Sequence, residues 1–98
     1  MTSLTKYTKN GHEFALVSRD GNVAIFHGLR IGGESSTWEV IHINPEAAYE
    51  RFGNQYPAQE LPPPNSEWGY KGWTYVSLAD AAVKYKSEVD VQNTKAEA

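Results

Sequence analysis

The sequence contains no cysteine, so neither a disulfide nor thiol chemistry can take part in its fold or function. It also lacks an apolar run approaching the roughly 20 residues that a membrane-spanning helix needs. The first residues, MTSLTKYTKNGHE, lack the apolar stretch of a signal peptide, and no Asn-x-Ser/Thr glycosylation site occurs. These absences favour a cytoplasmic protein without a membrane partner. The 98 residues suffice for one domain with a modest core.

A concentrated charge of one sign is also missing. Residues 1–33 carry four basic and two acidic side chains, residues 34–67 one basic and six acidic, and residues 68–98 four of each. No segment is basic enough to hold a nucleic-acid backbone by charge alone. The acidic middle segment is too sparse to imitate the phosphates of DNA. The charge distribution therefore disfavours nucleic acid as a partner.

Two apolar runs around Asp20-Gly21 predict an N-terminal hairpin. His12–Ser18 and Asn22–His27 flank this dipeptide, which favours a type I′ turn because that turn needs positive φ twice. With these two residues as the loop, Leu16 faces Ile25. Both sheet faces are then apolar, so each needs a cover. The first face carries Phe14, Leu16, Val23 and Ile25, with His12 and His27, and the second carries Ala15, Val17, Ala24 and Phe26.

The middle of the chain predicts a third strand and a short helix. The run WEVIHI, residues 38–43, is β-branched and aromatic, which is typical of a strand. Asn44 suits a helix N-cap, Pro45 suits the first helical position, and Gly53 suits the residue after a helix end. These residues predict a central helix over Ala47–Phe52. A rigid connector is expected at the three prolines, 62–64.

The C-terminal third predicts a short strand and a longer helix. Trp73–Val76 reads as the strand, and Ser77-Leu-Ala-Asp80 is a capping box that opens a helix of about twelve residues. Residues 90–98 show no pattern and are expected to form a flexible tail after a single domain, 1–89. The apolar stripe of the helix consists of Leu78, Ala82, Tyr85 and Val89.

These elements together predict an α+β fold, with a small antiparallel sheet of three or four strands, a short central helix and a C-terminal helix. The C-terminal helix is expected to cover the first sheet face. The second face is left to the central helix or to a second copy of the protein, since a large exposed apolar patch usually marks an interface.

No sequence pattern specifies an active site, a metal or another cofactor. The histidines at 12, 27 and 42 lack the cysteine partners and the HExxH spacing of zinc sites. GESST at 33–37 begins like the GxSxG of serine hydrolases but lacks the closing glycine. The glycines form neither GxGxxG nor a phosphate-binding loop. We therefore expect a protein that is not an enzyme and needs no cofactor.

The aromatic segment SEWGYKGWTYVSLADAA, residues 66–82, is the main candidate for a binding surface. Trp68, Trp73 and Tyr75 suit the core, because small domains need large side chains. We expect Tyr70 and Lys71 to be displayed on a turn because they lie between two glycines, and tyrosine is a common interface anchor. The candidate binding residues are Trp68, Tyr70, Lys71 and Trp73, with Phe26 on the second sheet face.

The same segment carries a resemblance. Its pattern Ser66-Glu67-Trp68-Gly69-x-x-Gly72-Trp73-Thr74-Tyr75, followed by Leu78, Ala82 and Tyr85, is similar to the C-terminal half of small uncharacterised proteins encoded by bacteriophages and prophages. Those proteins also tend to have a hairpin like EFALVSRDGNVAIFH and a strand like WEVIHI. The resemblance covers roughly residues 12–86. It implies a bacteriophage or bacterial cytoplasmic origin and no assigned activity.

A looser resemblance links Trp68-Gly69-x-x-Gly72 to the WGR domain, a DNA-binding module. The arginine that follows Trp-Gly in that family is Tyr70 here, and the basic surface is missing. Two hypotheses follow. The first is a small interaction protein, a bacteriophage or prophage accessory factor that binds a protein partner or itself. The alternative is a nucleic-acid-binding module that uses the aromatic turn, residues 66–75.

Overall fold

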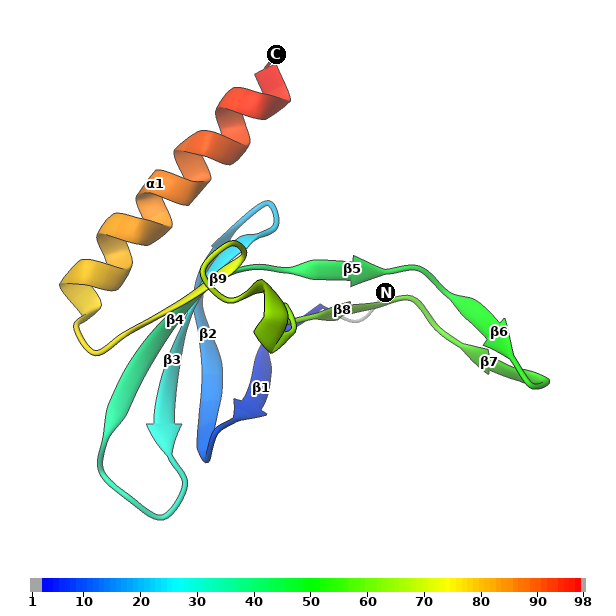
Figure 1. Ribbon diagram of the computed structural model, residues 1–98, viewed down its shortest axis with the longest axis horizontal. Coiled ribbons are helices and arrows are strands. Elements are labelled where there is room, and N and C mark those ends of the chain that lie inside the picture. The colour runs from blue at the N-terminus through cyan, green and yellow to red at the C-terminus, as the bar shows by residue number, and fades with distance from the viewer. Residues whose placement is uncertain (1–2, 98) are drawn as a thin grey trace.

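Five antiparallel strands form the body of the molecule (Figure 1). In their order across the sheet they are β1 (Lys6–Lys9), β2 (His12–Asp20), β3 (Val23–Arg30), β4 (Ser36–His42) and β9 (Gly72–Tyr75). One face of this sheet packs against the helix α1 (Leu78–Glu97), which contacts β3, β4 and β9. The structure is a computed structural model and describes residues 3–97. Within that range no helix combines the length and apolar character needed to cross a bilayer.

Between β4 and β9 the chain leaves the sheet as a long two-stranded arm, residues 44–61 (Figure 1). At its base β5 (Asn44–Glu46) pairs with β8 (Gln59–Leu61), and further out β6 (Tyr49–Arg51) pairs with β7 (Asn54–Tyr56). The tip residues Phe52 and Gly53 have φ values of 53° and 78°. A two-residue type I′ turn needs positive φ at both of these positions. A short 3₁₀ turn, η1 (Asn65–Glu67), then leads the chain back to β9.

The arm stands where a central helix over Ala47–Phe52 was predicted, and that prediction is wrong. The fold class is mainly β rather than α+β. The helix signals were ambiguous, because Gly53 provides the positive φ that both a helix end and a hairpin turn require. Tyr49 pairs across the ribbon with Tyr56, and their stacked rings lie 4.9 Å apart between centroids. Such a cross-strand aromatic pair stabilises a hairpin.

The predicted hairpin of β2 and β3 forms with a different turn. Asp20 pairs with Val23, so the loop residues are Gly21 and Asn22 rather than Asp20-Gly21. Gly21 has a φ of 61°, whereas the φ of Asn22 is not positive. Glycine at the first loop position is the requirement of a type II′ turn, which also suits the twist of a hairpin.

A bulge at Val17 changes the register further along the same hairpin. Leu16 lies opposite Phe26 instead of the predicted Ile25, because the pairing shifts between Leu16 and Ser18. Since side chains alternate across a strand, one extra residue moves the earlier part of β2 to the other face. Phe14 and Leu16 therefore join Phe26 on the side away from α1, which corrects the predicted composition of both faces.

The two faces of the sheet bury separate apolar clusters. One cluster lies between α1 and the sheet. Its buried residues are Val23, Ile25, Val40 and Ala81, packed against the half-buried Trp38, Trp73, Tyr75, Tyr85 and Val89. On the opposite face they are Phe14, Ala24, Phe26, Ile41 and Ile43, packed against Leu4, Tyr7, Leu16 and Trp68. Phe26 is 0% exposed, so it is a core residue and not the interface residue that was predicted. The segment around β1 covers this face, so neither a helix nor a second copy is needed there.

The helix α1 begins at the predicted capping box, but it is longer than predicted and buries a different face. Ser77 Oγ accepts a hydrogen bond from the Asp80 amide at 3.4 Å. The helix has 20 residues instead of about twelve, so the segment predicted as a tail is helical through Glu97; Ala98 lies outside the described residues. Leu78 is 49% exposed and Ala82 is also exposed, because the buried stripe instead runs through Ala81, Tyr85 and Val89.

Gln92, beyond the predicted helix end, fastens α1 to the β2–β3 turn. Its Oε1 accepts a hydrogen bond from the Asn22 amide, and its Nε2 donates one to the Asp20 carbonyl, both at 2.9 Å. A Cβ at Gly21 would lie 2.6 Å from Gln92 Nε2, so the glycine makes room for this contact.

This contact predicts that Gly21→Ala is more destabilising than Gly32→Ala. Both glycines have positive φ, which costs alanine about 1 kcal/mol, but only Gly21 packs against another residue. Displacement of Gln92 should add about 1 kcal/mol to the loss in free energy of unfolding. Denaturant unfolding measures both variants. In a Gln92→Ala background, Gly21→Ala and Gly32→Ala should lower the free energy of unfolding by the same amount. A larger loss for Gly21→Ala in that background would contradict the role given to Gln92.

Candidate functional site

The predicted aromatic residues do not form one surface. Trp68 packs on the side away from α1. Lys9 Nζ lies 3.0 Å from the centroid of the Trp68 ring, and Trp68 Nε1 donates a hydrogen bond to Thr74 Oγ1 at 3.0 Å. Trp73 packs under α1, where Lys84 Nζ lies 4.1 Å from its ring centroid. The sheet therefore separates the two tryptophans, and each is half-buried by its own cluster.

Tyr70 and Lys71 lie on the turn before β9. Tyr70 is 77% exposed, as predicted from its place between two glycines. Lys71 forms an exposed ion pair with Glu67 at 3.2 Å. Trp68 and Trp73 lie on opposite faces of the sheet, so they do not extend one surface around Tyr70.

Glu39 is a buried carboxylate in the middle of β4. Its oxygens accept hydrogen bonds from Tyr7 Oη at 2.6 Å and Thr74 Oγ1 at 3.1 Å, and Lys9 Nζ lies 3.3 Å away. Burial and the hydrogen bond to Glu39 raise the pKa of the Tyr7 hydroxyl above its ordinary value, so this hydroxyl stays protonated as a donor. The carboxylate thereby joins β1, β4 and β9, which is a structural role.

The histidines are dispersed. His12 and His27 were predicted on one face, but the bulge places them on opposite faces. His27 stacks on Trp38, with 4.7 Å between ring centroids, and His42 Nε2 lies 2.7 Å from Glu88 on α1. Among the described residues no three His, Asp or Glu side chains come together as a group that could hold a metal ion.

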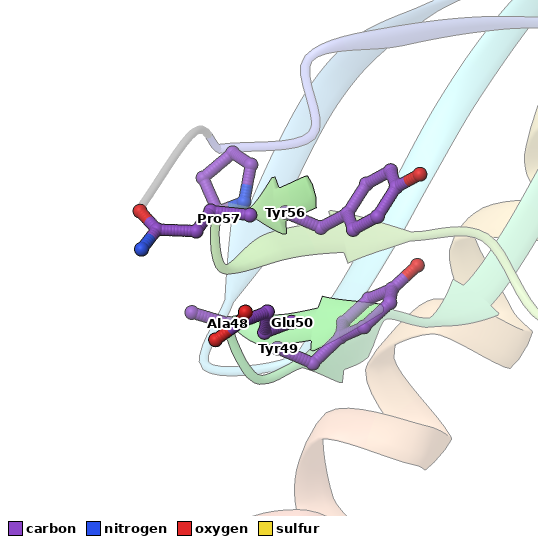
Figure 2. A pocket seen from close by; sticks show the side chains of 6 residues that line it. Ala48, Tyr49, Glu50, Tyr56 and Pro57 are labelled. Carbon is purple, nitrogen blue, oxygen red and sulfur yellow. The ribbon is translucent and has the colours of Figure 1, made fainter. Parts of the chain in front are cut away.

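The arm presents the most exposed aromatic group. Phe52 at its tip is 87% exposed, and Tyr49 and Tyr56 are 44% and 41% exposed. Figure 2 shows the two tyrosine rings one above the other on the same side of the ribbon. A hollow of about 440 Å³ is lined by Ala48, Tyr49, Glu50, Gln55, Tyr56 and Pro57. Strands β5 to β8 pack mainly against one another, so these side chains take no part in either core cluster.

A charged clamp fixes the base of the arm to the body. Arg19 on β2 donates to both carboxylate oxygens of Glu60, from Nη1 at 2.6 Å and from Nη2 at 2.7 Å. The Leu4 amide donates to the same carboxylate at 2.8 Å. Hydrogen bonding to Arg19 and then to the Leu4 amide lowers the pKa of Glu60 from 4.5 to about 2. The arm therefore projects from a fixed base.

Beyond this clamp the arm is acidic. Residues 44–61 contain Glu46, Glu50, Glu60 and Arg51, and only Glu60 is paired with a base of the body. Sequence reasoning missed this site because residues 47–52 were interpreted as a helix. The available hairpin signal was Gly53 at the tip, with Tyr49 and Tyr56 at equal distances from the pair Phe52-Gly53, but phenylalanine is an unusual residue at positive φ.

Comparison of the chain with protein-family models, with curated proteins and with solved structures gave no match.

The clamp predicts a specific pH dependence of stability. Because folding lowers the pKa of Glu60, its contribution is complete above about pH 4.5 and is lost as the pH falls towards 2. Glu60→Gln should lower the free energy of unfolding by about 1–2 kcal/mol at pH 6. The gap between variant and parent should narrow as the pH falls from 4.5 to 2, as measured by denaturant unfolding.

Glu50→Gln is the matched control, because Glu50 is an exposed arm carboxylate with no ion pair among the residues described. It should leave the stability of the monomeric chain unchanged at every pH. A Glu60→Gln variant that is as stable as the parent at pH 6 would show that the clamp contributes nothing.

Proposed function

We propose that the protein is a small non-enzymatic interaction protein that binds a protein partner through its arm. The observation that carries the proposal is the exposure of Tyr49, Phe52 and Tyr56 on a segment outside the core. Aromatic side chains are enriched in the buried centres of interfaces and supply much of the binding energy there. A partner that covered these rings would remove their apolar surface from water.

The construction of the arm also favours binding. The type I′ tip, the stacked tyrosines and the Arg19–Glu60 clamp each restrict its conformation before a partner arrives. A surface that is already ordered loses less conformational entropy on association. This supports a role for the arm as a preformed binding element.

The alternative is nucleic-acid binding. A two-stranded ribbon has a suitable width for the major groove of DNA, which gives this alternative a specific basis. The charge of the arm opposes it, because Glu46 and Glu50 would face phosphates with Arg51 as the arm's only base. A protein partner is therefore the better-supported proposal. The bacteriophage or prophage setting and the cytoplasmic location belong to the same proposal and rest on the sequence resemblance.

The proposal predicts that a protein partner is captured through the arm and not through the aromatic turn. Affinity capture from the native host should retain one specific protein with the parent chain. The double variant Tyr49→Ala/Tyr56→Ala should reduce that retention at least tenfold, because it removes both stacked rings. Tyr70→Ala is the matched control, since it removes an exposed tyrosine from the turn, and it should retain the partner.

Retention on DNA that falls steeply with salt, with no arm-dependent protein captured, would instead support the nucleic-acid alternative. Equal loss of the partner in Tyr70→Ala and in the double variant would move the site from the arm to the turn.

A further inference from the structure

A second apolar surface lies on the body, on the helix side of β2 and β3. The helix α1 packs on β3, β4 and β9, and its contacts with β2 lie near the β2–β3 turn, where Tyr85 meets Ser18 and Gln92 meets Asp20. On this side Leu29 is 55% exposed and Ile31 is 62% exposed. The β2–β3 hollow, of about 340 Å³, is lined by Glu13, Ala15, His27, Leu29, Arg30 and Ile31.

We infer that a partner of the arm is a second copy of this chain, and that Phe52 of one copy occupies the β2–β3 hollow of the other. This inference rests on the proposed function, because it names the partner that the arm binds. Each chain carries both halves of such a contact, an exposed ring on the arm and an uncovered apolar hollow on the body.

The Phe52 ring and the β2–β3 hollow agree in size. Phe52 is the most exposed large apolar side chain, and the ring on its turn can enter a hollow with apolar walls at Ala15, Leu29 and Ile31. Cavities of about 300 Å³ and more are large enough to enclose a group of this size. Contact would cover exposed apolar surface on both copies at once.

The charged side chains next to Phe52 are complementary to those that line the β2–β3 hollow. Glu50 and Arg51 precede Phe52 on the arm, and Glu13 and Arg30 line the hollow. None of these four side chains forms an ion pair within the described part of the chain. Insertion of Phe52 can place Glu50 beside Arg30 and Arg51 beside Glu13 of the other copy, and opposite charges at such positions fix the register of an interface.

A reciprocal exchange closes the assembly as a dimer. Each copy gives one arm and receives one, so a two-fold axis satisfies both contacts without leaving a free arm. The three arm rings together offer roughly 400 Å² of exposed surface per copy. With the surface of the two hollows the total is roughly 1,000 Å², which is typical of a weak dimer that forms as the concentration rises.

Sedimentation velocity of the full chain over a range of concentrations tests the inference. The parent should shift from monomer to dimer as its concentration rises, and Phe52→Ser should remain a monomer at every concentration. Phe52 is outside the core, so at a concentration where the parent is a monomer the circular dichroism and melting temperature of the variant should match those of the parent. Tyr70→Ser is the matched control, an equally exposed aromatic on another turn, and should dimerise like the parent.

A charge exchange tests the orientation. Glu50→Arg and Arg30→Glu should each weaken the dimer at least tenfold, because each brings like charges together. The double variant Glu50→Arg/Arg30→Glu should recover most of the parent's affinity. Failure of the double variant to recover, with all three variants folded, would overturn the pairing of Glu50 with Arg30.

A parent chain that stays monomeric at the highest concentration overturns the inference. The same result leaves the proposed function intact if a different protein is still captured through Tyr49 and Tyr56. Loss of both the dimer and that capture would mean that the proposed function has failed as well.

Discussion

The extra residue at Val17 determines which side chains meet across the sheet. By shifting the register of β2 by one position, it places Phe14 and Leu16 with Phe26 on the face away from α1. That face thereby acquires a full core, which the N-terminal segment covers. The same shift leaves Ala15 on the helix side, opposite His27, where both residues line the β2–β3 hollow. The buried core and the uncovered hollow are therefore two consequences of one bulge.

Local signals predicted the elements of the sheet and helix, but not their register. The β2–β3 hairpin, the strand at 38–43 and the helix start at Ser77 each follow from a short pattern, and all are present. The bulge was not visible, because apolar residues occupy both faces of β2 and no alternation marks a shift. β1 was missed, although Asn10-Gly11, with φ values of 50° and 76°, carries a strong hairpin signal. The helix beyond Val89 was missed because its contact with the sheet is polar and distant in sequence.

The candidate site was harder to predict than the fold. Flanking glycines were enough to indicate that Tyr70 is exposed, because this property is local. The separation of Trp68 from Trp73 depends on the tight turn between them, which brings Trp68 beside Gly72 and which composition alone does not reveal. Tyr49 and Phe52 of the arm were assigned to a helix, because Asn44-Pro45 and Gly53 fit both a helix and a hairpin. The helix and the hairpin are distinguished by the pairing of β5 with β8 and of β6 with β7, which joins residues that are separated along the chain.

The structure divides the chain into a body that contains both core clusters and an arm that contains neither. If the aromatic side chains of the arm serve binding, the body should fold without them. The direct measurement is the free energy of unfolding of a chain in which Asn-Gly replaces residues 47–58, so that the clamp at Glu60 is kept. At low concentration, where association is negligible, the loss should stay below about 1 kcal/mol, as for changes outside a core. A body that unfolds, or loses several kcal/mol, would show that the arm is part of the fold and would contradict its role as a separate binding element.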